Sequence, residues 1–237
     1  MNETIQVLMN RKSVRVFEDK EITPEIKDII LAAAMRAPTG GNCMPYSIID
    51  VTDQSIKDKL AETCDHQPFI AQAKMVLIFC ADYHRWYRKF KMAGCEDIPA
   101  PELSNMVLAT EDAVIAAHTA CIAAESLGIG SCYIGDIVEN FEIHKELLNL
   151  PPQVAPLCML VFGYPTQQQK ERKQPTRFAK SSIVFENQYR ELSEEELLEM
   201  MPNDRTKAFY NRKYISDFAQ EMVRSTKEIF KNWNTKD

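Results

Sequence analysis

The sequence SNMVLATEDAVIAAHTACIAAESLG occupies residues 104–128 and carries the longest helical pattern in the chain. The pattern runs from Ser104 to Leu127, about 36 Å at about 1.5 Å per residue, and Gly128 is the residue type that commonly ends a helix. One face is made mostly of alanine, at positions 109, 113, 116, 117, 120, 123 and 124. Because alanine lets neighbouring backbones approach closely, the segment is predicted to be a central helix packed on several sides.

Segments with strand character lie on both sides of this helix in the chain. Met75–Ala81 is continuously apolar, which is typical of a strand inside a sheet that is covered on both faces. Further strands are predicted at Tyr46–Val51, Ser131–Ile134 and Pro156–Phe162, and Ser181–Glu186 is also strand-like.

Helices are predicted between and after these strands. Thr23 and Pro24 form a helix start, and the apolar period that follows is stopped by Pro38. Other helices are expected at Asp53–Cys64, Ile143–Leu148, Ser193–Met201 and about Asn211–Trp233, with a polar loop at Gln167–Thr176. Strands interspersed with helices, without strict βαβ spacing, indicate an α+β sandwich rather than a doubly wound sheet.

Size and charge exclude several classes of protein. The chain has 237 residues, of which 45% are hydrophobic and 26% charged, so collagen, a disulfide scaffold and a disordered chain are excluded. A chain of this length buries about 70% of its surface, which suits one compact domain over residues 1–237. The net charge of −6 opposes broad nucleic-acid binding.

The chain shows no targeting or membrane signal. Its apolar runs fall short of the roughly 20 residues that span a bilayer, and the N-terminus lacks the pattern of a secretory signal. Seven cysteines form an odd set without a CxxC pair, which suits a reducing compartment. We therefore expect a cytoplasmic protein without a disulfide framework.

A cluster of positively charged residues stands out in this acidic chain. On an extended backbone, Arg11, Ser13 and Arg15 would share one face, with Lys12 between them. Guanidinium forks and a hydroxyl match the oxygens of a phosphate, so the segment is a candidate anion clamp. The alternative interpretation is a solvated charged run.

Two glycine-containing segments offer backbone that a planar ligand could approach. APTGGN at residues 37–42 follows the first predicted helix, and on its own it is more typical of a helix stop and turn than of a ligand-binding loop. GIGSCYIG at residues 128–135 superficially resembles a dinucleotide-binding loop. It follows a helix and precedes a strand, however, and the Rossmann motif requires the reverse order.

No side-chain constellation for metal or hydrolase chemistry is present in the sequence. The four histidines lack metal-ligand spacing, and there is no G-x-S-x-G elbow. Any chemistry is therefore expected to reside in a bound cofactor that carries a phosphate.

Taken together, these segments resemble the FMN-dependent nitroreductase family, in particular its NADPH nitroreductase and flavin reductase branch. The resemblance covers nearly the whole chain and is carried by RKSVRVF (11–17), APTGGN (37–42), QPFIAQ (67–72) with FCAD (79–82), AESLGIG (124–130) with YIG (133–135), and IVFEN (183–187). It implies a sandwich with a central mixed sheet flanked by helices. It also implies a homodimer with exchanged terminal segments, in which residues from about 165 to 237 pack on the partner.

The resemblance also implies which residues contact FMN. The phosphate is expected at Arg11, Lys12, Ser13 and Arg15, with Arg177 as a second phosphate-side arginine and Lys173 as a substitute for a lysine that Pro175 replaces. The flavin ring is expected beside Thr39, Gly40 and Gly41, beside Gln67 at its pyrimidine side, and along Tyr133, Ile134 and Gly135. Asp136 departs from the family pattern, because a second glycine usually follows Gly135.

The activity implied is transfer of a hydride from NADPH or NADH through FMN to nitroaromatics, quinones or flavins, in a ping-pong sequence without a catalytic side chain. A basic cluster of Arg205, Lys207, Arg212 and Lys213 is a candidate for the NADPH 2′-phosphate, and a solvated helix face is the alternative. Two other functions stay open. One is an FMN carrier or sensor without nicotinamide turnover, and the other is a related FMN enzyme such as a dehalogenase.

Overall fold

The computed structural model describes residues 1–236. These form two compact units, one made of residues 1–172 with residues 224–236 and the other of residues 173–223. The first unit contains the whole sheet and the central helix and is called the sheet unit below. The second is called the C-terminal unit.

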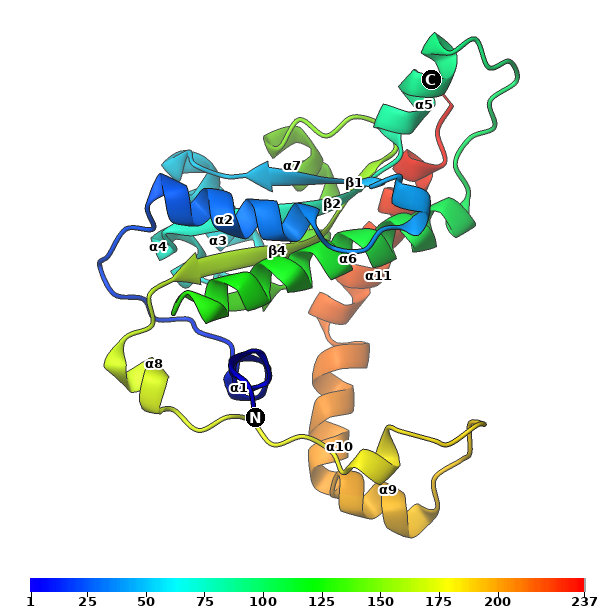
Figure 1. Cartoon of the computed structure of the whole chain (residues 1–237). Coiled ribbons are helices and arrows are strands. Elements are labelled where there is room, and N and C mark those ends of the chain that lie inside the picture. Colours follow the sequence, from blue (N-terminus) through cyan, green and yellow to red (C-terminus); the bar gives the residue numbers. More distant parts are fainter. Residues whose placement is uncertain (237) are drawn as a thin grey trace. The chain divides into compact units, whose positions relative to one another are not determined.

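The sheet has four strands in the order β1-β2-β4-β3, with β1 at Tyr46–Asp50, β2 at Met75–Asp82, β3 at Gly130–Ile134 and β4 at Val154–Gly163 (Figure 1). Every pair of neighbouring strands is antiparallel. The four strands thus form an antiparallel sheet and not the mixed sheet that the resemblance implies. An isolated parallel bridge between Ser13 and Ser131, outside the strands, places the N-terminal segment beside β3. The four strands predicted before and after the central helix in the chain, at Tyr46–Val51, Met75–Ala81, Ser131–Ile134 and Pro156–Phe162, are confirmed.

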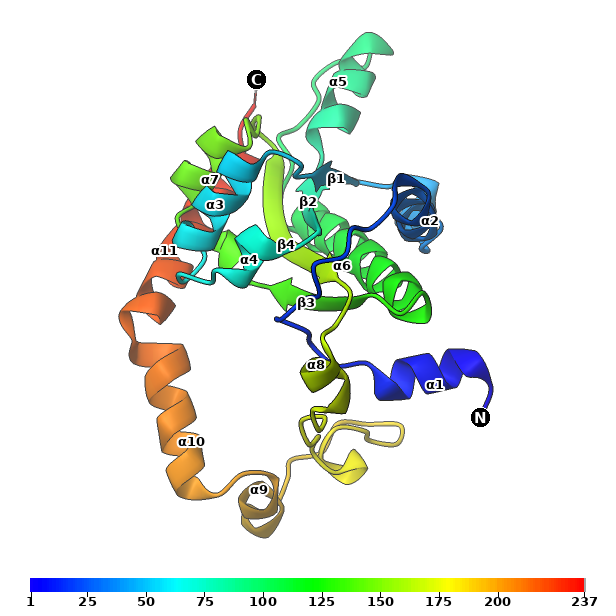
Figure 2. The same cartoon turned by 90° about the vertical axis from the view of Figure 1, so that its left-hand side faces the viewer.

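Helices cover both faces of the sheet, as the α+β prediction requires (Figures 1 and 2). Side chains of β2 alternate between the faces. Leu77 and Phe79 pack with α2 (Pro24–Met35) and α6 (Leu103–Ser126), whereas Val76 and Ile78 pack with α3 (Gln54–Thr63) and α4 (Phe69–Gln72). All eight residues of β2 are buried, which explains why its sequence is continuously apolar.

The central helix α6 has the small-residue face that its sequence predicts. Ala113, Ala116, Ala117, Ala120 and Ala124 are fully buried between α2 and the sheet. The helix ends where expected, since Gly128 adopts a left-handed φ of +75°. Within residues 1–236, α6 is the one helix long and apolar enough to span a membrane by length and composition. In this fold the buried part of its apolar surface forms the core.

The remaining helices of the sheet unit are mostly short. They are α1 (Glu3–Asn10), η1 (Gly40–Asn42), α5 (His84–Met92), η2 (Asp136–Val138), α7 (Phe141–Leu147) and α8 (Gln167–Glu171). The prediction of a loop over Gln167–Thr176 was wrong at α8. This single turn is stabilised by distant contacts, because Gln169 is buried and Lys170 pairs with Glu18 at 3.0 Å.

The end of α11 (Asp217–Trp233) belongs to the sheet unit. Trp233 is fully buried, and its indole N–H donates to the carbonyl of Glu102 at 3.2 Å. The Ser225 hydroxyl accepts the backbone N–H of Phe141 at 3.2 Å. Residues 224–236 therefore pack on their own chain, while partner packing of the segment before them stays a prediction.

The C-terminal unit contains η3 (Lys180–Ser182), α9 (Glu194–Met200), α10 (Asn203–Tyr210), a π-helical turn at Asn211–Ile215 and the beginning of α11. The strand predicted at Ser181–Glu186 was wrong, because this segment starts with a 3₁₀ turn and pairs with no strand among the described residues. The helix predicted over Asn211–Trp233 is interrupted at Ser216. Its backbone is extended, and its hydroxyl accepts the N–H of Ala219 at 3.3 Å.

Candidate functional site

The basic segment at residues 11–15 lies along the edge of β3. The N–H of Val14 donates to the carbonyl of Ser131 at 2.9 Å, and the Val14 side chain is buried. Phe17 continues the contact at Gly163 of β4, where a Cβ would come within 2.6 Å of the Phe17 ring. A backbone hydrogen bond and one contact that requires glycine therefore hold the segment against the sheet.

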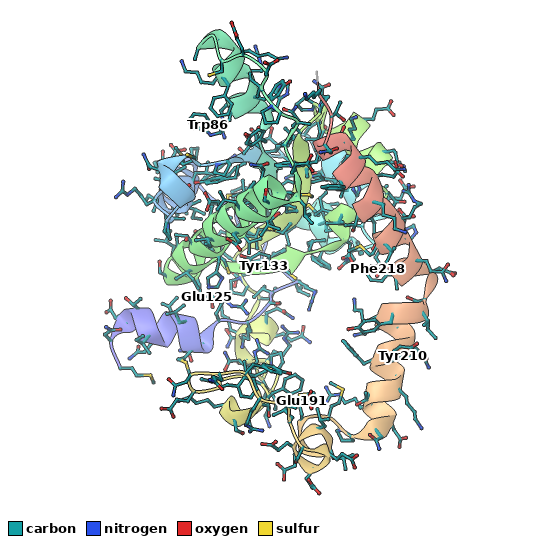
Figure 3. The ribbon with its side chains drawn as sticks, turned by 90° about the vertical axis from the view of Figure 1, so that its right-hand side faces the viewer. Trp86, Glu125, Tyr133, Glu191, Tyr210 and Phe218 are labelled. Carbon is teal, nitrogen blue, oxygen red and sulfur yellow. The ribbon has the colours of Figure 1, made fainter. Side chains whose placement is uncertain are left out.

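Three of the predicted phosphate-binding residues act on one thiol, that of Cys132. Burial raises the pKa of Cys132 on β3, and Arg15, Ser13 and Arg11 each oppose this rise. Arg11 also opposes the burial-induced rise in the pKa of Glu125 on α6. Figure 3 shows Glu125 and Tyr133 near the point where the chain leaves α1. Arg11 and Arg15 thus place positive charge at the edge of β3, with the Ser13 hydroxyl between them in the chain.

Lys12 has additional partners that the sequence does not reveal. Its ammonium donates to the carbonyls of Lys170 and Arg172, at 2.6 and 2.5 Å, near the end of α8. The guanidinium of Arg172 in turn donates to the carbonyl of Ser13. An ammonium has three donors, so one remains for an anion while the other two attach α8 to the basic segment.

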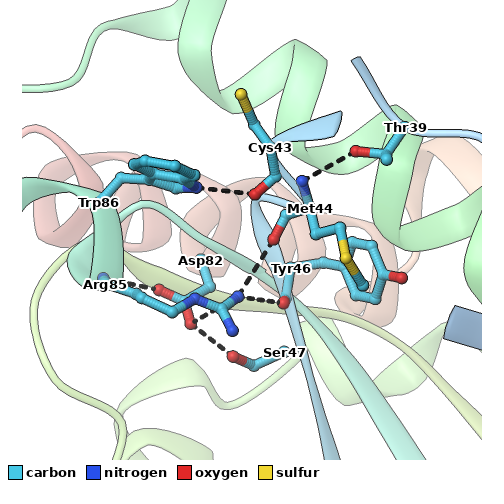
Figure 4. A network of polar contacts seen from close by, with 8 residues as sticks. All are labelled: Thr39, Cys43, Met44, Tyr46, Ser47, Asp82, Arg85 and Trp86. Carbon is cyan, nitrogen blue, oxygen red and sulfur yellow. Dashed lines mark hydrogen bonds and ion pairs between the residues drawn. The ribbon is translucent and has the colours of Figure 1, made fainter. Parts of the chain in front are cut away.

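The loop after α2 is organised by a buried carboxylate. Asp112 of α6 is 3% exposed and accepts the Thr39 hydroxyl and the N–H of Gly40, the latter at 3.2 Å. The Thr39 oxygen also accepts the N–H of Met44 at 2.9 Å (Figure 4). Gly41 follows with a φ of +58°. Thr39 and Gly40 thus shape the loop through Asp112, a residue that the sequence analysis missed because its contacts lie 72 and 73 residues away.

Gln67 and the segment after β3 meet directly. The Gln67 side-chain nitrogen donates to the carbonyl of Cys64 at 2.9 Å and to the Asp136 carboxylate at 2.7 Å. A Cβ built on neighbouring Gly135 would find no atom within 4 Å. The structure thus brings the predicted pyrimidine-side residue next to the predicted ring-flanking segment, with open space beside Gly135.

Tyr133 and Ile134 point in opposite ways from the end of β3. Tyr133 is 36% exposed, whereas Ile134 is 2% exposed within the core. Partial burial raises the pKa of the Tyr133 hydroxyl above its ordinary value. At this position a ligand would therefore meet the side chain of Tyr133 and the backbone of Ile134.

The two remaining predicted residues, Lys173 and Arg177, lie in the C-terminal unit. Arg177 lines a cavity of about 500 Å³ within that unit, together with Arg205. Among the other members of the basic cluster, the Lys213 ammonium lies 4.5 Å from the centre of the Phe218 ring. These positions leave the roles of the C-terminal residues as predictions.

A further cavity, of about 730 Å³, lies at the end of the sheet where β1 begins and β2 ends, and none of the predicted site residues lines it. Figure 4 shows the polar network beside it. Arg85 donates to the carbonyls of Met44 and Tyr46 at 3.1 and 2.6 Å, and the Trp86 indole donates to the carbonyl of Cys43 at 2.8 Å. The available sequence signal was the basic composition of α5.

Comparison with known proteins accounts for this arrangement. A model of the Nitroreductase family matches residues 8–164, from α1 to the end of β4. The chain belongs to the Nitroreductase family. It is 32% identical to an FMN reductase (NADPH) of Bacillus subtilis over 96% of this chain and 88% of that protein. It is 34% identical to an oxygen-insensitive NADPH nitroreductase of Salmonella typhimurium, over 82% of this chain and 78% of that one.

A solved structure of the same kind is similar along nearly the whole chain. The NADPH:FMN oxidoreductase of Vibrio harveyi, complexed with NAD⁺, superimposes with a TM-score of 0.82 at 27% identity, covering 97% of this chain and 98% of that one. The nitroreductase fold therefore includes the C-terminal segments whose sequence pattern is weak.

The donor set of this nitroreductase suits a phosphate-bearing planar cofactor. Arg11, Ser13 and Arg15 supply positive charge and a hydroxyl at the edge of β3, and the space beside Gly135 is open. No cluster of histidine, cysteine and acidic residues within residues 1–236 could hold a metal ion.

Proposed function

We propose that this nitroreductase is an FMN-dependent oxidoreductase that takes a hydride from NADPH or NADH and passes the electrons to nitroaromatics, quinones or flavins. The observation that carries the proposal is the convergence of the basic segment 11–15, Gln67 and the end of β3 at one side of the sheet unit. Bound FMN would supply the redox chemistry, and the proposal therefore assigns no side chain of this chain as an acid or base. Relatives named as FMN reductases and nitroreductases support this assignment.

In this proposal Arg11, Ser13 and Arg15 hold the FMN phosphate and Lys12 assists with its remaining donor. Gln67, Tyr133, Ile134 and Gly135 lie along the ring, with Thr39, Gly40 and Gly41 supplying a second loop. Lys173 and Arg177 complete the phosphate side. Support comes from the clustering of the first three side chains and from the contact between Gln67 and Asp136.

We further propose that two copies of the chain form a homodimer with FMN at the interface and terminal segments packed on the partner. The support is apolar surface on the central helix, where Val107 is 50% exposed and Ile115 is 40% exposed. In the C-terminal unit Ile183 and Val184 are 61% and 57% exposed. Such exposed apolar surface is typical of an interaction face.

The oligomeric state can be measured by sedimentation. Ile115→Lys is expected to shift the protein toward the monomer, because a charge would be placed in the interface. Ile143→Lys on α7 is the control, since Ile143 is 43% exposed on the opposite layer of the sheet unit. A monomeric wild-type protein would contradict the dimer while leaving FMN binding to be tested separately.

The same proposal places the protein in the cytoplasm. The seven cysteines are unpaired, and five of them are buried, which suits a reducing compartment.

The proposal also gives the basic cluster a role in the preference for NADPH. Its members are Arg205, Lys207, Arg212 and Lys213. Equal steady-state rates with NADH and NADPH would contradict this role.

The deciding experiment is an absorption spectrum of the purified protein with FMN, followed by addition of NADPH and then NADH without oxygen. We expect flavin bands that bleach with a reduced nicotinamide and return when a nitroaromatic or quinone is added. A bound flavin that does not bleach would favour the carrier or sensor function. Failure to bind FMN would contradict the proposal, and halide release from a halogenated aromatic would indicate the dehalogenase.

A further inference from the structure

Gln67 is held at both its backbone and its side chain. Its N–H donates to the carbonyl of Ala61 at 2.8 Å, and its own carbonyl accepts the N–H of Ile70 at 3.1 Å. The side-chain nitrogen then bridges the carbonyl of Cys64 and the carboxylate of Asp136, at 2.9 and 2.7 Å. Gln67 is therefore a fixed group.

The partners of the Gln67 amide determine its orientation. A backbone carbonyl and a carboxylate are both hydrogen-bond acceptors, so the atom that faces them must be the NH₂ group. An amide NH₂ has two hydrogens, and these two contacts use both of them. The oxygen of Gln67 is thus the atom left to meet a ligand, and it can only accept a hydrogen bond.

Asp136 is positioned to impose this orientation. It begins η2, where its carbonyl accepts the N–H of Glu139 at 3.0 Å and the Gly135 carbonyl accepts the N–H of Val138 at 3.1 Å. Within residues 1–236 no ion pair links Asp136 to a cation at 4.0 Å or less. Its charge also reaches Cys64, whose thiol pKa is raised first by burial and then by Asp136 and Glu139. Asp136 is thus an anchored carboxylate without a neutralising partner.

We propose that Asp136 is a positioning residue that fixes Gln67 as a hydrogen-bond acceptor toward the FMN ring and adds negative charge beside it. This inference rests on the proposed function, and it concerns two residues of this chain rather than the cofactor as such. The acceptor suits a ring N–H, which the pyrimidine edge of FMN offers. The charge disfavours the electron-rich reduced ring, so it lowers the reduction potential of the bound flavin.

Two substitutions separate orientation from charge. Asp136→Ala leaves the Cys64 carbonyl as the one acceptor for the Gln67 amide. It is expected to weaken FMN binding about 2- to 10-fold, the effect of one neutral hydrogen bond. Asp136→Asn keeps an oxygen that can accept from Gln67 while removing the charge. It is expected to retain most of the FMN affinity and to raise the midpoint potential. Asp65→Asn is the matched control, because Asp65 is an exposed carboxylate two residues from Gln67.

A double-mutant cycle tests whether Asp136 acts through Gln67. In a Gln67→Ala background, Asp136→Ala should leave the FMN dissociation constant unchanged. An equal loss in both backgrounds would overturn the positioning role. An Asp136→Asn midpoint potential identical to the wild type would overturn the charge effect.

A measurement without flavin keeps this inference distinct from the proposed function. In the apoprotein, the side-chain NH₂ resonances of Gln67 in a ¹⁵N NMR spectrum should shift on Asp136→Ala and stay in place on Asp65→Asn. Unchanged resonances would overturn the contact itself, whatever the protein binds. Shifted resonances in a protein that does not take up FMN would instead show that the contact exists and that the proposed function fails.

Discussion

Val14 packs so closely against Gly130 that a Cβ at position 130 would come within 2.5 Å of the Val14 Cγ2 atom. Real Cβ contacts do not reach this distance, so a side chain at position 130 would force Val14 and the N-terminal segment to shift on β3. The glycine that superficially belongs to a nucleotide-binding loop is thus required for packing. Through Val14 it sets the place of the neighbouring Ser13 and Arg15.

Gly130→Ala is expected to destabilise the protein by about 1–3 kcal/mol, the usual cost of overpacking a well-packed site. It should also weaken FMN binding, because the displaced strand carries the phosphate-binding side chains. Denaturant unfolding and FMN titration measure the two effects. Gly135→Ala is the control for stability, since a Cβ there meets no atom within 4 Å. Equal stability of the two variants would contradict the packing argument.

Arg15→Ala is expected to weaken FMN binding by roughly 10- to 100-fold, because a charge-assisted hydrogen bond contributes about 1.5–3 kcal/mol. Fluorescence titration of the apoprotein with FMN measures the dissociation constant. Arg88→Ala removes an equal charge from α5, in the wall of the cavity at the far end of the sheet, and should leave the constant unchanged. An unaltered constant in Arg15→Ala would show that the phosphate lies elsewhere.

Elements with strong local signals could be predicted from the sequence. The continuous apolar run of β2 and the alanine face of α6 reflect burial on several sides, so each pattern specifies its own environment. The helix α5 was missed because its sequence is basic and aromatic, and its Trp86 and Arg85 side chains bond to backbone near β1. Such contacts produce no periodic pattern in the sequence.

The residues of the candidate site also differ in whether the sequence could predict them. Arg11 and Arg15 could be recognised because positive charges close together in the sequence stand out in an acidic chain, and Ser13 lies between them. The contact of Lys12 with the carbonyls of Lys170 and Arg172 joins residues about 160 positions apart, and backbone acceptors have no sequence signature. Asp112 was missed for a related reason, since its carboxylate is buried within an otherwise apolar helix face.

Trp233→Ala is expected to destabilise the sheet unit by about 3–5 kcal/mol, because the indole is fully buried and truncation leaves a large cavity. Trp233→Phe retains most of the packing and loses the hydrogen bond to the Glu102 carbonyl, so its effect should be smaller. Tyr210→Ala is the control from the C-terminal unit, where Tyr210 is 53% exposed. Chemical denaturation ranks the three variants. A neutral Trp233→Ala would mean that residues 224–236 do not pack on their own chain.

His144 makes stability depend on pH through its burial. Its ring is fully buried, with Nε2 2.8 Å from the Thr63 hydroxyl and Nδ1 2.9 Å from the carbonyl of Ile137. Burial lowers the pKa of His144 below its ordinary value of 6.5, although the backbone carbonyls oppose the shift. The folded state therefore resists a proton that the unfolded chain accepts.

The sign of the effect follows from this difference. Above pH 6.5 the imidazole is neutral in both states and its burial costs no ionisation energy. As pH falls below 6.5, the unfolded chain binds a proton first, and stability drops by at most about 1.4 kcal/mol per pH unit until the folded pKa is reached. His144→Gln should have a smaller slope in this acid window, measured by denaturant unfolding at a series of pH values. His118→Gln, at an exposed position on α6, should keep the wild-type slope. Glutamine does not titrate, so the His144→Gln variant lacks the proton that His144 binds on unfolding. If its slope nevertheless equals that of the wild type, groups other than His144 cause the acid sensitivity.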